Sequence, residues 1–498
     1  MNNYDIIVIG AGNGGLTAAA TLTQKGLRVL LLERHNIPGG CATSFCRGRF
    51  EFEVALHQLS GLGTPENPGP LRMTLDKINV LNKLEFVPMT DLYRFVMPDK
   101  IDITLKPDRA EIIEELQRHF PHEKEGIQQY MDLVYNFFTQ VIGVFYLNDP
   151  ETSRKKYPLY YQYALKTTQE VMDQFIKDPM LQAVLSPFWT YVGLPPSKMA
   201  FVDMAAMLFA YIEFIPFHLK GGSQALSNAI ADTIIENGGT IRFNCGVKKI
   251  IIENSSVKGV ITDKGETISA ENIISNASKL TTYVDLIDKN NVPEPIIKEL
   301  KQCSISPSAF TLYMGLDCEP NQVGITESSN FLVPGIDNDY IYERMKEIDI
   351  DGRNAMMLSC YNLIDPGFSP PGTSQVALVT LKYGDPWLSV PPGQYVDEKY
   401  RVADAMLKVV EKTFPGLRKH IEEIEIATPI THLRYLGTPR GSIYGFENHI
   451  KDSSLFIPNE SHIKGLYLAG GSVGLCGFQP TLDSGVITAK KLIRDKAA

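Results

Sequence analysis

A strand, a glycine-rich turn and a helix follow one another near the start of the chain, and they constrain the fold more than any other feature. The β-branched apolar residues at 6–9 are typical of a parallel strand that is buried on both faces. Gly10, Gly12 and Gly15 follow with the spacing G-x-G-x-x-G and lead into an Ala/Leu/Thr-rich helical pattern at 16–24. This order of elements predicts a Rossmann-like nucleotide-binding unit.

Each glycine of this turn has a physical role. Gly10 allows the tight turn, Gly12 lets backbone N–H groups approach a pyrophosphate, and Gly15 lets the helix pack closely on the strand. A second apolar strand at 28–32 ends in Glu33, whose carboxylate can accept hydrogen bonds from an adenosine ribose. The sequence therefore predicts a bound dinucleotide; the alternative is a glycine-rich turn without a ligand.

Length, charge and hydropathy exclude several classes of protein. A chain of 498 residues can bury a large core and is expected to form two or three domains. Its formal net charge of −9 argues against a nucleic-acid-binding surface. The first strand lies too close to Met1 for a signal peptide, and no apolar run reaches the roughly 18 residues of a spanning helix. We therefore expect a cytoplasmic protein that is soluble or attached peripherally to a membrane.

The cysteines show no pattern of a disulfide framework or a metal site. There are seven, an odd number, and none forms a C-x-x-C pair. They stand at positions 41, 46, 245, 303, 318, 360 and 476. This distribution predicts reduced thiols, and we identify neither a metal cluster nor a hydrolase triad in the sequence.

Two stretches in the first half of the chain are rich in aromatic and apolar residues. Apolar side chains recur at helical spacing over 127–141, and the stretch 201–217 is denser, interrupted only by Asp203 and Glu213. Because the second stretch lacks the Lys/Arg-rich face of an interfacial helix, it predicts a cavity wall or a core rather than a membrane surface. We predict that residues from about 125 to 217 form a lid over a substrate tunnel.

The remaining periodic segments predict returns to the nucleotide-binding unit and a separate sheet. A helix at 225–236 and strands at 240–243, 247–253, 257–262 and 273–275 bring the chain back to the nucleotide-binding unit. Strands at 310–315 and 375–382 with a helix at 400–413 predict a separate sheet. A strand at 465–471 ends in glycines, and a helix at 481–494 follows it. The N-terminus of that last helix can face an electron-rich group.

Four blocks of the sequence together resemble a known family. They are the N-terminal fingerprint through Gly40, Pro216 with Gly221-Gly222, Ile273-Ile-Ser-Asn-Ala277 and Gly465-Leu-Tyr-Leu-Ala-Gly470. The chain resembles the FAD-dependent phytoene desaturase, carotenoid isomerase and retinol saturase family of amine-oxidase-like flavoproteins. A fifth block, Thr428-Pro429 with Leu436-Gly-Thr-Pro-Arg-Gly-Ser-Ile-Tyr-Gly445, is most similar to the saturase and isomerase branch.

The resemblance implies an α/β fold in which a Rossmann-like FAD-binding domain is assembled from discontinuous segments. On this basis the FAD domain comprises 1–75, 216–300 and 456–498, a substrate region with a helical lid comprises 76–215, and a substrate-binding β-sheet domain comprises 301–455. The residues that it assigns to FAD are Gly10, Gly12, Asn13, Gly14, Gly15, Glu33, Arg34, Gly39, Gly40, Val247, Asn276, Gly470, Gly471 and Thr481. Among them Glu33 would bind the adenosine ribose, and the helix start near Thr481 would lie at the flavin.

One position departs from the family pattern. The family usually has Gly-Asp after the C-terminal strand, where the Asp bonds ribityl or phosphate oxygens, whereas this chain has Gly470-Gly471. Loss of one charge-assisted hydrogen bond costs about 1.5–3 kcal/mol of binding free energy. Unless other groups replace this contact, the departure implies that FAD is held less tightly than in the rest of the family, or that it arrives with the substrate or a membrane.

Candidates for proton transfer are few, and each has a structural alternative. His57 matches a stretch that lies near the flavin in the family, although a lone His is also a common hydrogen-bonded core residue. Burial in the apolar stretch would raise the carboxyl pKa of Glu213 or Asp203, but either acid can instead face water. Arg440 and Tyr444 belong to the saturase-like block and would contact substrate or flavin, unless that block is a surface turn.

The resemblance implies an FAD-dependent oxidoreductase that acts on C=C or C–C bonds of a lipophilic polyene. The leading expectation is that reduced flavin saturates or isomerises a double bond of a carotenoid or retinoid-like isoprenoid, with NAD(P)H as a candidate reductant. Three alternatives stay open: a carotenoid or phytoene desaturase, an unsaturated fatty-acid isomerase or hydratase, and a non-catalytic prenyl-lipid escort protein. Conjugated double bonds accept hydride better than isolated ones, because the charge delocalises.

Overall fold

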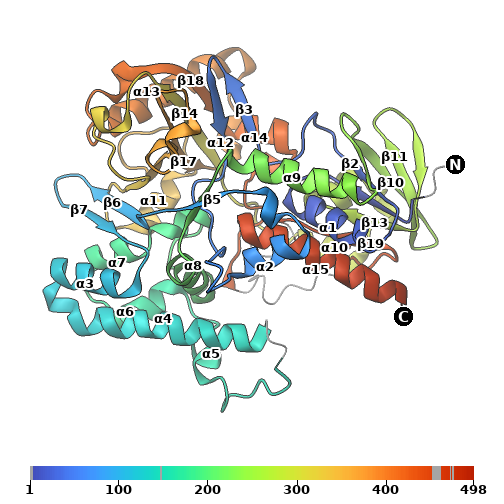
Figure 1. The fold of residues 1–498 in the computed structure, drawn as a ribbon, viewed down its shortest axis with the longest axis horizontal. Helices are drawn as coiled ribbons and strands as arrows, with labels where there is room; N and C mark the ends of the chain where they lie inside the picture. Colours follow the sequence, from blue (N-terminus) through green and yellow to red (C-terminus); the bar gives the residue numbers. More distant parts are fainter. Residues whose placement is uncertain (1–3, 146–148, 451–460, 472, 474–475, 498) are drawn as a thin grey trace.

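The computed structural model describes residues 4–145, 149–450, 461–471, 473 and 476–497. Figure 1 shows a nucleotide-binding-type parallel sheet at one end, an antiparallel sheet with α13 at the other, and a layer of helices beside the antiparallel sheet. This mixed α/β architecture is the predicted fold class. Its parts are interleaved along the sequence, so that segments far apart in the chain meet in the five-stranded and the seven-stranded sheets.

The N-terminal fingerprint folds as predicted, at the centre of a five-stranded parallel sheet with the order β19-β13-β1-β2-β9. Its strands are β1 (Ile6–Ile9), β2 (Val29–Leu32), β9 (Thr240–Arg242), β13 (Asn272–Ser275) and β19 (Leu466–Leu468). All neighbouring strands are parallel, and β1 and β2 are fully buried, as their continuous apolar runs require. Helix α1 (Asn13–Thr23) packs between α9 (Gly222–Glu236) and α15 (Phe478–Ala497).

The strands predicted at 247–253 and 257–262 do not join this parallel sheet. They form β10 (Val247–Glu253) and β11 (Ser256–Thr262), which pair with β12 (Thr267–Ser269) in a separate antiparallel sheet. The reason is local, because Asn254 and Ser255 both adopt positive φ (50° and 58°), as a tight two-residue hairpin turn requires.

A seven-stranded sheet has the order β18-β14-β17-β16-β15-β6-β7 and is antiparallel except between β6 and β15. Its strands are β6 (Tyr93–Met97), β7 (Ile101–Leu105), β14 (Ser308–Leu316), β15 (Ser329–Leu332), β16 (Met356–Cys360), β17 (Ser374–Lys382) and β18 (Ile421–Ala427). Helix α13 (Tyr395–Val410) covers one face through a core that includes Met406 and Trp387. The predicted separate sheet is thus present. It also contains β6 and β7, which belong to the predicted substrate region at 76–215.

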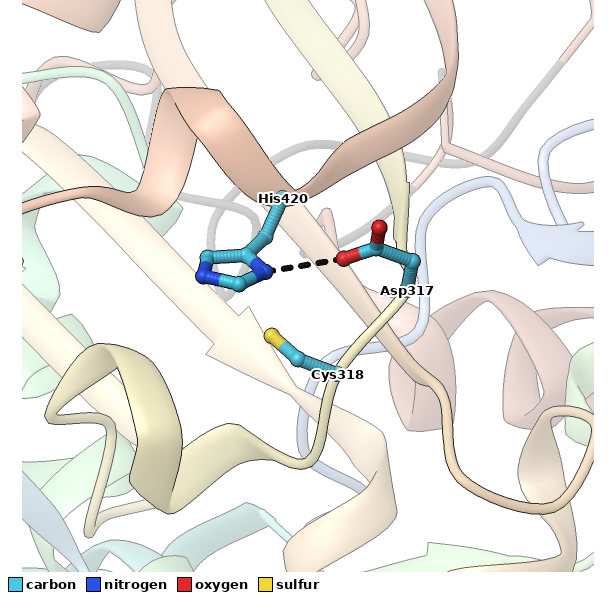
Figure 2. Close-up of side chains that lie close together, drawn as sticks. All are labelled: Asp317, Cys318 and His420. Atoms are coloured by element: carbon cyan, nitrogen blue, oxygen red, sulfur yellow. Dashed lines mark hydrogen bonds and ion pairs between the residues drawn. The ribbon is translucent and has the colours of Figure 1, made fainter.

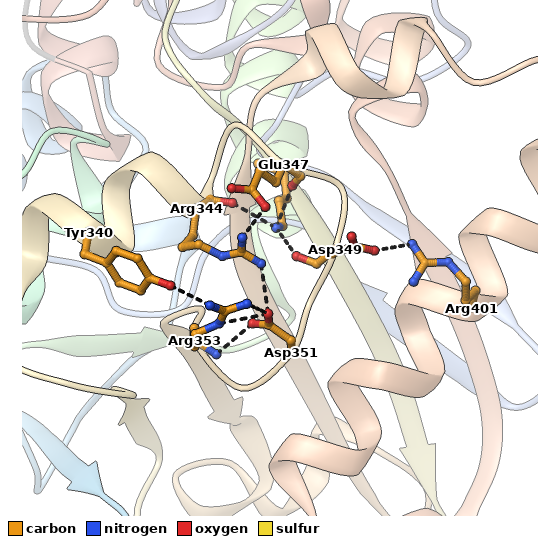
Figure 3. A network of polar contacts seen from close by, with 8 residues as sticks. Tyr340, Arg344, Glu347, Asp349, Asp351, Arg353 and Arg401 are labelled. Carbon is orange, nitrogen blue, oxygen red and sulfur yellow. Dashed lines mark hydrogen bonds and ion pairs between the residues drawn. The ribbon is translucent and has the colours of Figure 1, made fainter.

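A buried ammonium group holds the loop between α11 (Asn338–Arg344) and β16. Lys382 at the end of β17 has no exposed surface, and its Nζ donates to the carbonyl oxygens of Arg344, Glu347 and Asp349 at 3.2, 2.8 and 2.8 Å. Burial lowers the pKa of Lys382 to about 7. Figure 3 shows the surrounding ion pairs and hydrogen bonds, which join Arg344 to Glu347 and Asp351, Arg353 to Asp351 and Tyr340, and Arg401 to Asp349.

The predicted lid stretch folds into a layer of helices with a large aromatic core. Its helices are α4 (Lys124–Phe145), α5 (Pro158–Tyr163), α6 (Thr168–Phe175), α7 (Pro179–Leu185) and α8 (Phe201–Glu213), and α3 (Arg109–His119) precedes them. The elements not yet named are β3 (Ser44–Arg47), β4 (Phe50–Glu53), β5 (Phe86–Pro88), β8 (Phe217–Leu219), α2 (Pro70–Lys77), α10 (Glu294–Leu300), α12 (Gly384–Leu388) and α14 (Pro429–Leu436).

Within the described residues, no helix has both the length and the apolar character needed to cross a bilayer. The thiols of Cys41, Cys46, Cys245, Cys318, Cys360 and Cys476 are free.

Candidate functional site

One cavity of about 1910 Å³ extends from the fingerprint turn to the helical layer and the seven-stranded sheet. Its volume is roughly twice the upper end of the usual range for small-molecule sites, about 300–1,000 Å³. At one end it is lined by glycines and by Glu33, and at the other by aromatic and aliphatic side chains. The cavity therefore has room for a dinucleotide and a second, apolar ligand.

The fingerprint glycines form a cradle that side chains would fill. A Cβ at Gly14 would lie 2.6 Å from the backbone N of Gly470, and one at Gly12 would lie 2.8 Å from Asn276 Nδ2. A Cβ at Gly15 would lie 1.9 Å from Gly10 O, so Gly15 serves the close packing of helix on strand. Gly15 is not part of the cavity wall, whereas Gly10, Gly12 and Gly14 are.

Helix α1 presents an uncapped N-terminus to this cradle. Its N-cap residue is Gly12, and no side chain accepts hydrogen bonds from its first-turn N–H groups. Free N–H groups and the helix dipole make such a terminus a site for anions such as pyrophosphate. Asn13 lines the cavity beside it; Nδ2 donates to Thr481 Oγ1 at 3.2 Å, while the buried Oδ1 has no hydrogen-bond partner. This orphaned oxygen and the uncapped helix fit a polar ligand such as a dinucleotide.

Glu33 lies at the end of β2, as predicted, with its carboxylate at the cavity wall. Oε2 accepts from Ala11 N and Oε1 from His35 N, each at 2.7 Å. Each carboxylate oxygen can accept a second hydrogen bond, so Glu33 is held in place and still has capacity for ribose hydroxyls. Arg34 also lines the cavity, but its guanidinium donates to the backbone carbonyls of Arg434 and Tyr435 in α14.

The other residues assigned to FAD all lie on the cavity wall. They are Gly39, Gly40, Val247, Asn276, Gly470, Gly471 and Thr481. The last helix begins at Phe478 rather than near Thr481, so Thr481 lies in its first turns. Gly471 is unhindered, because a Cβ there would meet only Thr481 Cγ2, at 3.8 Å. The family's Asp is therefore absent from this position without any steric reason.

The structure separates the three residues predicted to act in catalysis. His57 lines the cavity, with Nδ1 3.1 Å from Tyr361 Oη, and burial lowers the pKa of His57 to about 4, so its imidazole is neutral. Glu213 does not line the cavity; as the last residue of α8 it is exposed, and Oε1 accepts from Asn67 Nδ2 at 3.1 Å. Of the two alternatives for Glu213, the structure shows the one in which the acid faces water. Arg440 is also exposed, lies outside the cavity wall and pairs with Asp385 at 3.1 Å.

Asp203 is the acid that the fold buries in the cavity wall. It lies in the first turn of α8 and is 3 % exposed, and Asn448 Nδ2 donates to its Oδ2 at 3.2 Å. Burial raises the pKa of Asp203 to about 7, although the Asn448 bond opposes the shift. The charge of Asp203 also helps to raise the pKa of Cys476, which places the acid within electrostatic reach of the turn before α15. A carboxyl that titrates near neutrality in a cavity is a functional candidate.

The apolar end of the cavity is an aromatic enclosure. The rings of Phe138 and Phe209 lie 5.1 Å apart, and those of Tyr191 and Phe331 lie 5.8 Å apart. Lining residues from the seven-stranded sheet and the loop before it are Met345, Met356, Met357, Val379 and Leu381. Tyr444 of the saturase-like block lines the cavity as well, and its hydroxyl donates to Thr190 O at 2.9 Å. The enclosure suits a long apolar molecule with aromatic contacts along it.

Sequence reasoning missed two polar residues of the wall. His432, in α14, has a buried Nε2 without a hydrogen-bond partner, and Ser442 has an unpartnered Oγ. Both lie in or beside the block that resembles saturases and isomerases, and that resemblance was the available signal. These atoms are free to bond a ligand in the cavity.

Comparisons with known proteins agree with this geometry. A family model described as "Flavin containing amine oxidoreductase" matches residues 14–493. The prolycopene isomerase 1 of an Oncidium hybrid cultivar is 27 % identical over 520 residues, covering 99 % of this chain and 84 % of that protein. The all-trans-retinol 13,14-reductase of Danio rerio is 25 % identical over 532 residues, covering 99 % of this chain and 86 % of that protein.

Solved structures show the same fold at low identity. An oxidoreductase from Methanosarcina mazei superposes with a TM-score of 0.65 at 19 % identity, covering 98 % of this chain and 99 % of that one. Putrescine oxidase bound to putrescine superposes with a TM-score of 0.66 at 11 % identity, covering 99 % of both chains. These likenesses confirm the predicted amine-oxidase-like fold.

Proposed function

The chain belongs to the family of flavin-containing amine oxidoreductases, and from this premise we propose that it binds FAD and saturates or isomerises a double bond of a lipophilic polyene, such as a carotenoid or a retinoid-like isoprenoid. The observation that carries the proposal is the continuous cavity, whose glycine cradle opens into an aromatic enclosure. Two of the relatives are named for an isomerase acting on prolycopene and a reductase acting on retinol, which are both polyenes.

The residues around the cradle would hold FAD without covalent attachment. The uncapped N-terminus of α1 would face the pyrophosphate, Glu33 the ribose and Asn13 Oδ1 a donor of the cofactor. When bound and reduced, FAD supplies a hydride to a carbon–carbon double bond. The chain itself orients the polyene along the aromatic wall and excludes water from it.

We assign the proton that completes saturation to Asp203. A double bond that gains a hydride at one carbon needs a proton at the other, and a protonated carboxyl in the cavity wall can donate it. Asn448 Nδ2 donates to Oδ2, which fixes the carboxyl and leaves Oδ1 to carry the proton. His57 is the second candidate, because it also lines the cavity, but with a pKa of about 4 it has to take up a proton before it can give one.

An anaerobic experiment tests the proposed function and its direction. Protein whose flavin has been reduced with dithionite is mixed with a conjugated polyene, and the flavin spectrum and the product mass are followed. A gain of two hydrogens with reoxidised flavin indicates saturation, whereas an unchanged mass with a new retention time indicates isomerisation. If reduced protein does neither, and oxidised protein removes hydrogen from a more saturated lipid, the direction is wrong. Bleaching of the oxidised flavin when NAD(P)H is added to the same anaerobic cuvette would identify NAD(P)H as the reductant.

We expect two substitutions to move FAD affinity in opposite directions. Glu33→Ala should weaken FAD binding about tenfold or more, because a hydrogen bond to a charged acceptor is worth about 1.5–3 kcal/mol. Gly471→Asp should tighten binding, since the site is open and the new carboxylate restores the contact usual in the family. Flavin content after gel filtration measures both, with Glu236→Ala, on the exposed side of α9, as the control. Full occupancy in Glu33→Ala would contradict the ribose assignment.

We also expect the aromatic enclosure to control turnover but not cofactor binding. Phe209→Asp places a carboxylate where Phe138 and Phe214 pack at 5.1 and 6.1 Å, and a desolvated charge repels an apolar substrate. Polyene turnover should fall at least tenfold while flavin content stays unchanged. Leu165→Asp, in the same helical layer but 70 % exposed, is the matched control. Normal turnover in Phe209→Asp would refute the lid assignment.

A further inference from the structure

Three side chains with metal-binding atoms meet at the edge of the seven-stranded sheet, away from the cavity. Asp317 and Cys318 directly follow β14, and His420 directly precedes β18, the strand paired with β14. Figure 2 shows the three side chains turned toward one another, and their ligand atoms lie within 4.8 Å of each other. None of them lines the cavity, so the cluster is distinct from the proposed flavin site.

The backbone under this cluster is fixed by hydrogen bonds. Asp317 N donates to His420 O at 2.9 Å, which continues the pairing of the two strands by one step. Ser374 Oγ, from a fully buried side chain on β17, donates to Cys318 O at 2.8 Å. Nδ1 of His420 lies 2.8 Å from Asp317 Oδ1. Two of the ligand atoms are therefore already side by side, and the third is held on a rigid strand end.

The chemistry of the three ligands favours zinc. Thiolate, imidazole and carboxylate are the ligand types that Zn²⁺ takes, at about 2.0–2.3 Å in tetrahedral geometry, which puts ligand atoms about 3.5 Å apart. The present separations reach that spacing through small rotations of the side chains. A hard cation such as Mg²⁺ would avoid the sulfur.

The exposure of the cluster leaves a route for the ion and a place for water. Cys318 is 3 % exposed and forms the floor, whereas the side chains of Asp317 and His420 are 54 % and 40 % exposed. Arg49 lies within electrostatic reach of Asp317, but its guanidinium is paired with Glu422 at 2.5 Å. One thiolate and one carboxylate neutralise the two charges of the ion.

We propose that Asp317, Cys318 and His420 bind one zinc ion, with water as the fourth ligand. The ion would tie the end of β14 to the start of β18, two points that are 102 positions apart in the chain when counted from Cys318 to His420. This separation explains why cysteine spacing alone predicted no metal site. The site differs from a zinc ribbon or finger, whose ligands come in close sequence pairs.

Metal analysis of the flavin-loaded, tag-free protein tests this proposal. The protein is treated with a chelator, equilibrated with a small excess of zinc and passed through gel filtration, and the zinc content is measured by mass spectrometry. Wild type should retain one zinc per chain, and Cys318→Ser and His420→Ala should each retain at least tenfold less. With Co²⁺ in place of zinc, wild type should show a thiolate-to-cobalt charge-transfer band that Cys318→Ser lacks.

Matched controls separate this site from adventitious binding. His122 and Asp178 form another exposed histidine–carboxylate pair at 2.8 Å, and Cys46 is an exposed cysteine, so His122→Ala and Cys46→Ser should keep the zinc. If Cys318→Ser fails to fold, Asp317→Asn and His420→Ala carry the test, because both side chains are about half exposed. A wild-type chain that retains no zinc, or variants that retain as much as wild type, overturn the proposal.

Discussion

Asp203→Asn lowers the rate of polyene saturation by about 10²–10⁴-fold, the usual contribution of a general acid, and leaves FAD bound. The amide fills the same space and keeps the contact with Asn448, but it has no proton to give. Stopped-flow reoxidation of reduced flavin by a conjugated polyene measures the effect. Glu213→Gln, at the exposed end of the same helix, is the matched control and keeps the wild-type rate. An unchanged rate in Asp203→Asn, with a large loss in His57→Gln, would move the proton donor to His57.

The same substitution changes the pH dependence of the rate. Asp203 has a pKa of about 7, so the protonated acid predominates below pH 7, and its fraction falls about tenfold for each pH unit well above it. The wild-type saturation rate should therefore be level in mild acid and decline above pH 7. The residual rate of Asp203→Asn should lack this decline. A wild-type rate that rises through pH 7 would contradict the role of Asp203 as an acid.

At alkaline pH, Asp203→Asn should raise the free energy of unfolding although it lowers the activity. The pKa of Asp203 is raised from 3.8 to about 7 on folding, so the folded state binds this proton more tightly than the unfolded state. The resulting stabilisation is complete below about pH 4 and is lost as the pH rises to 7. Above pH 7 the buried carboxylate costs on the order of 4 kcal/mol of unfolding free energy. Asp203→Asn should therefore be more stable than wild type at pH 8 and similar at pH 4, as measured by urea unfolding.

Gly14→Ala abolishes normal flavin retention. The new methyl group would lie 2.6 Å from the backbone N of Gly470, 2.7 Å from Asn276 Oδ1 and 2.9 Å from Gly470 Cα. Because two of these contacts are with backbone, the turn after β19 has to move away from α1. Overpacking of this kind costs about 1–3 kcal/mol. If this cost destabilises the FAD-bound form alone, FAD binding becomes roughly 10- to 100-fold weaker.

The flavin-to-protein absorbance ratio after gel filtration measures this loss. Gly335→Ala is the control, because a Cβ there has no neighbour within 4 Å. Far-ultraviolet circular dichroism checks that the fold persists. A Gly14→Ala protein that is isolated with full FAD would show that the turn between β19 and α15 adapts, and that the cradle is not rigid.

The local parts of the fold could be predicted from the sequence, and the long-range parts could not. β1, its glycines and β2 lie within 27 consecutive residues, and the periodicity and glycine positions there determine the structure directly. β6 pairs with β15, however, more than 200 residues later, and no local pattern specifies that partner. The strands β10 and β11 were predicted, but no local pattern showed that they pair in a sheet separate from the parallel one.

The residues of the site divide in the same way, into those that the local sequence predicts and those that it does not. Glu33 and the glycine cradle were predictable, because strand, turn and helix place them by local geometry alone. Asp203 and Glu213 lie in one apolar stretch, and nothing in the sequence distinguishes their expected burial. In the structure, α8 buries the side chain of Asp203 and exposes that of Glu213. Which end of an apolar helix is covered depends on what packs there, here Asn448 and Cys476 from the C-terminal part of the chain.

The arrangement of the parallel sheet has a consequence for how the protein is made. β1 and β19 belong to the same sheet, but more than 450 residues separate them. At about 5–20 residues per second, a ribosome needs on the order of 20–90 seconds to pass from one to the other. During that time the turn at Gly14 has no Gly470 opposite it, so a nascent chain cannot close the cradle around a nucleotide. Closure of the cradle around a cofactor therefore requires that nearly the whole chain has been synthesised.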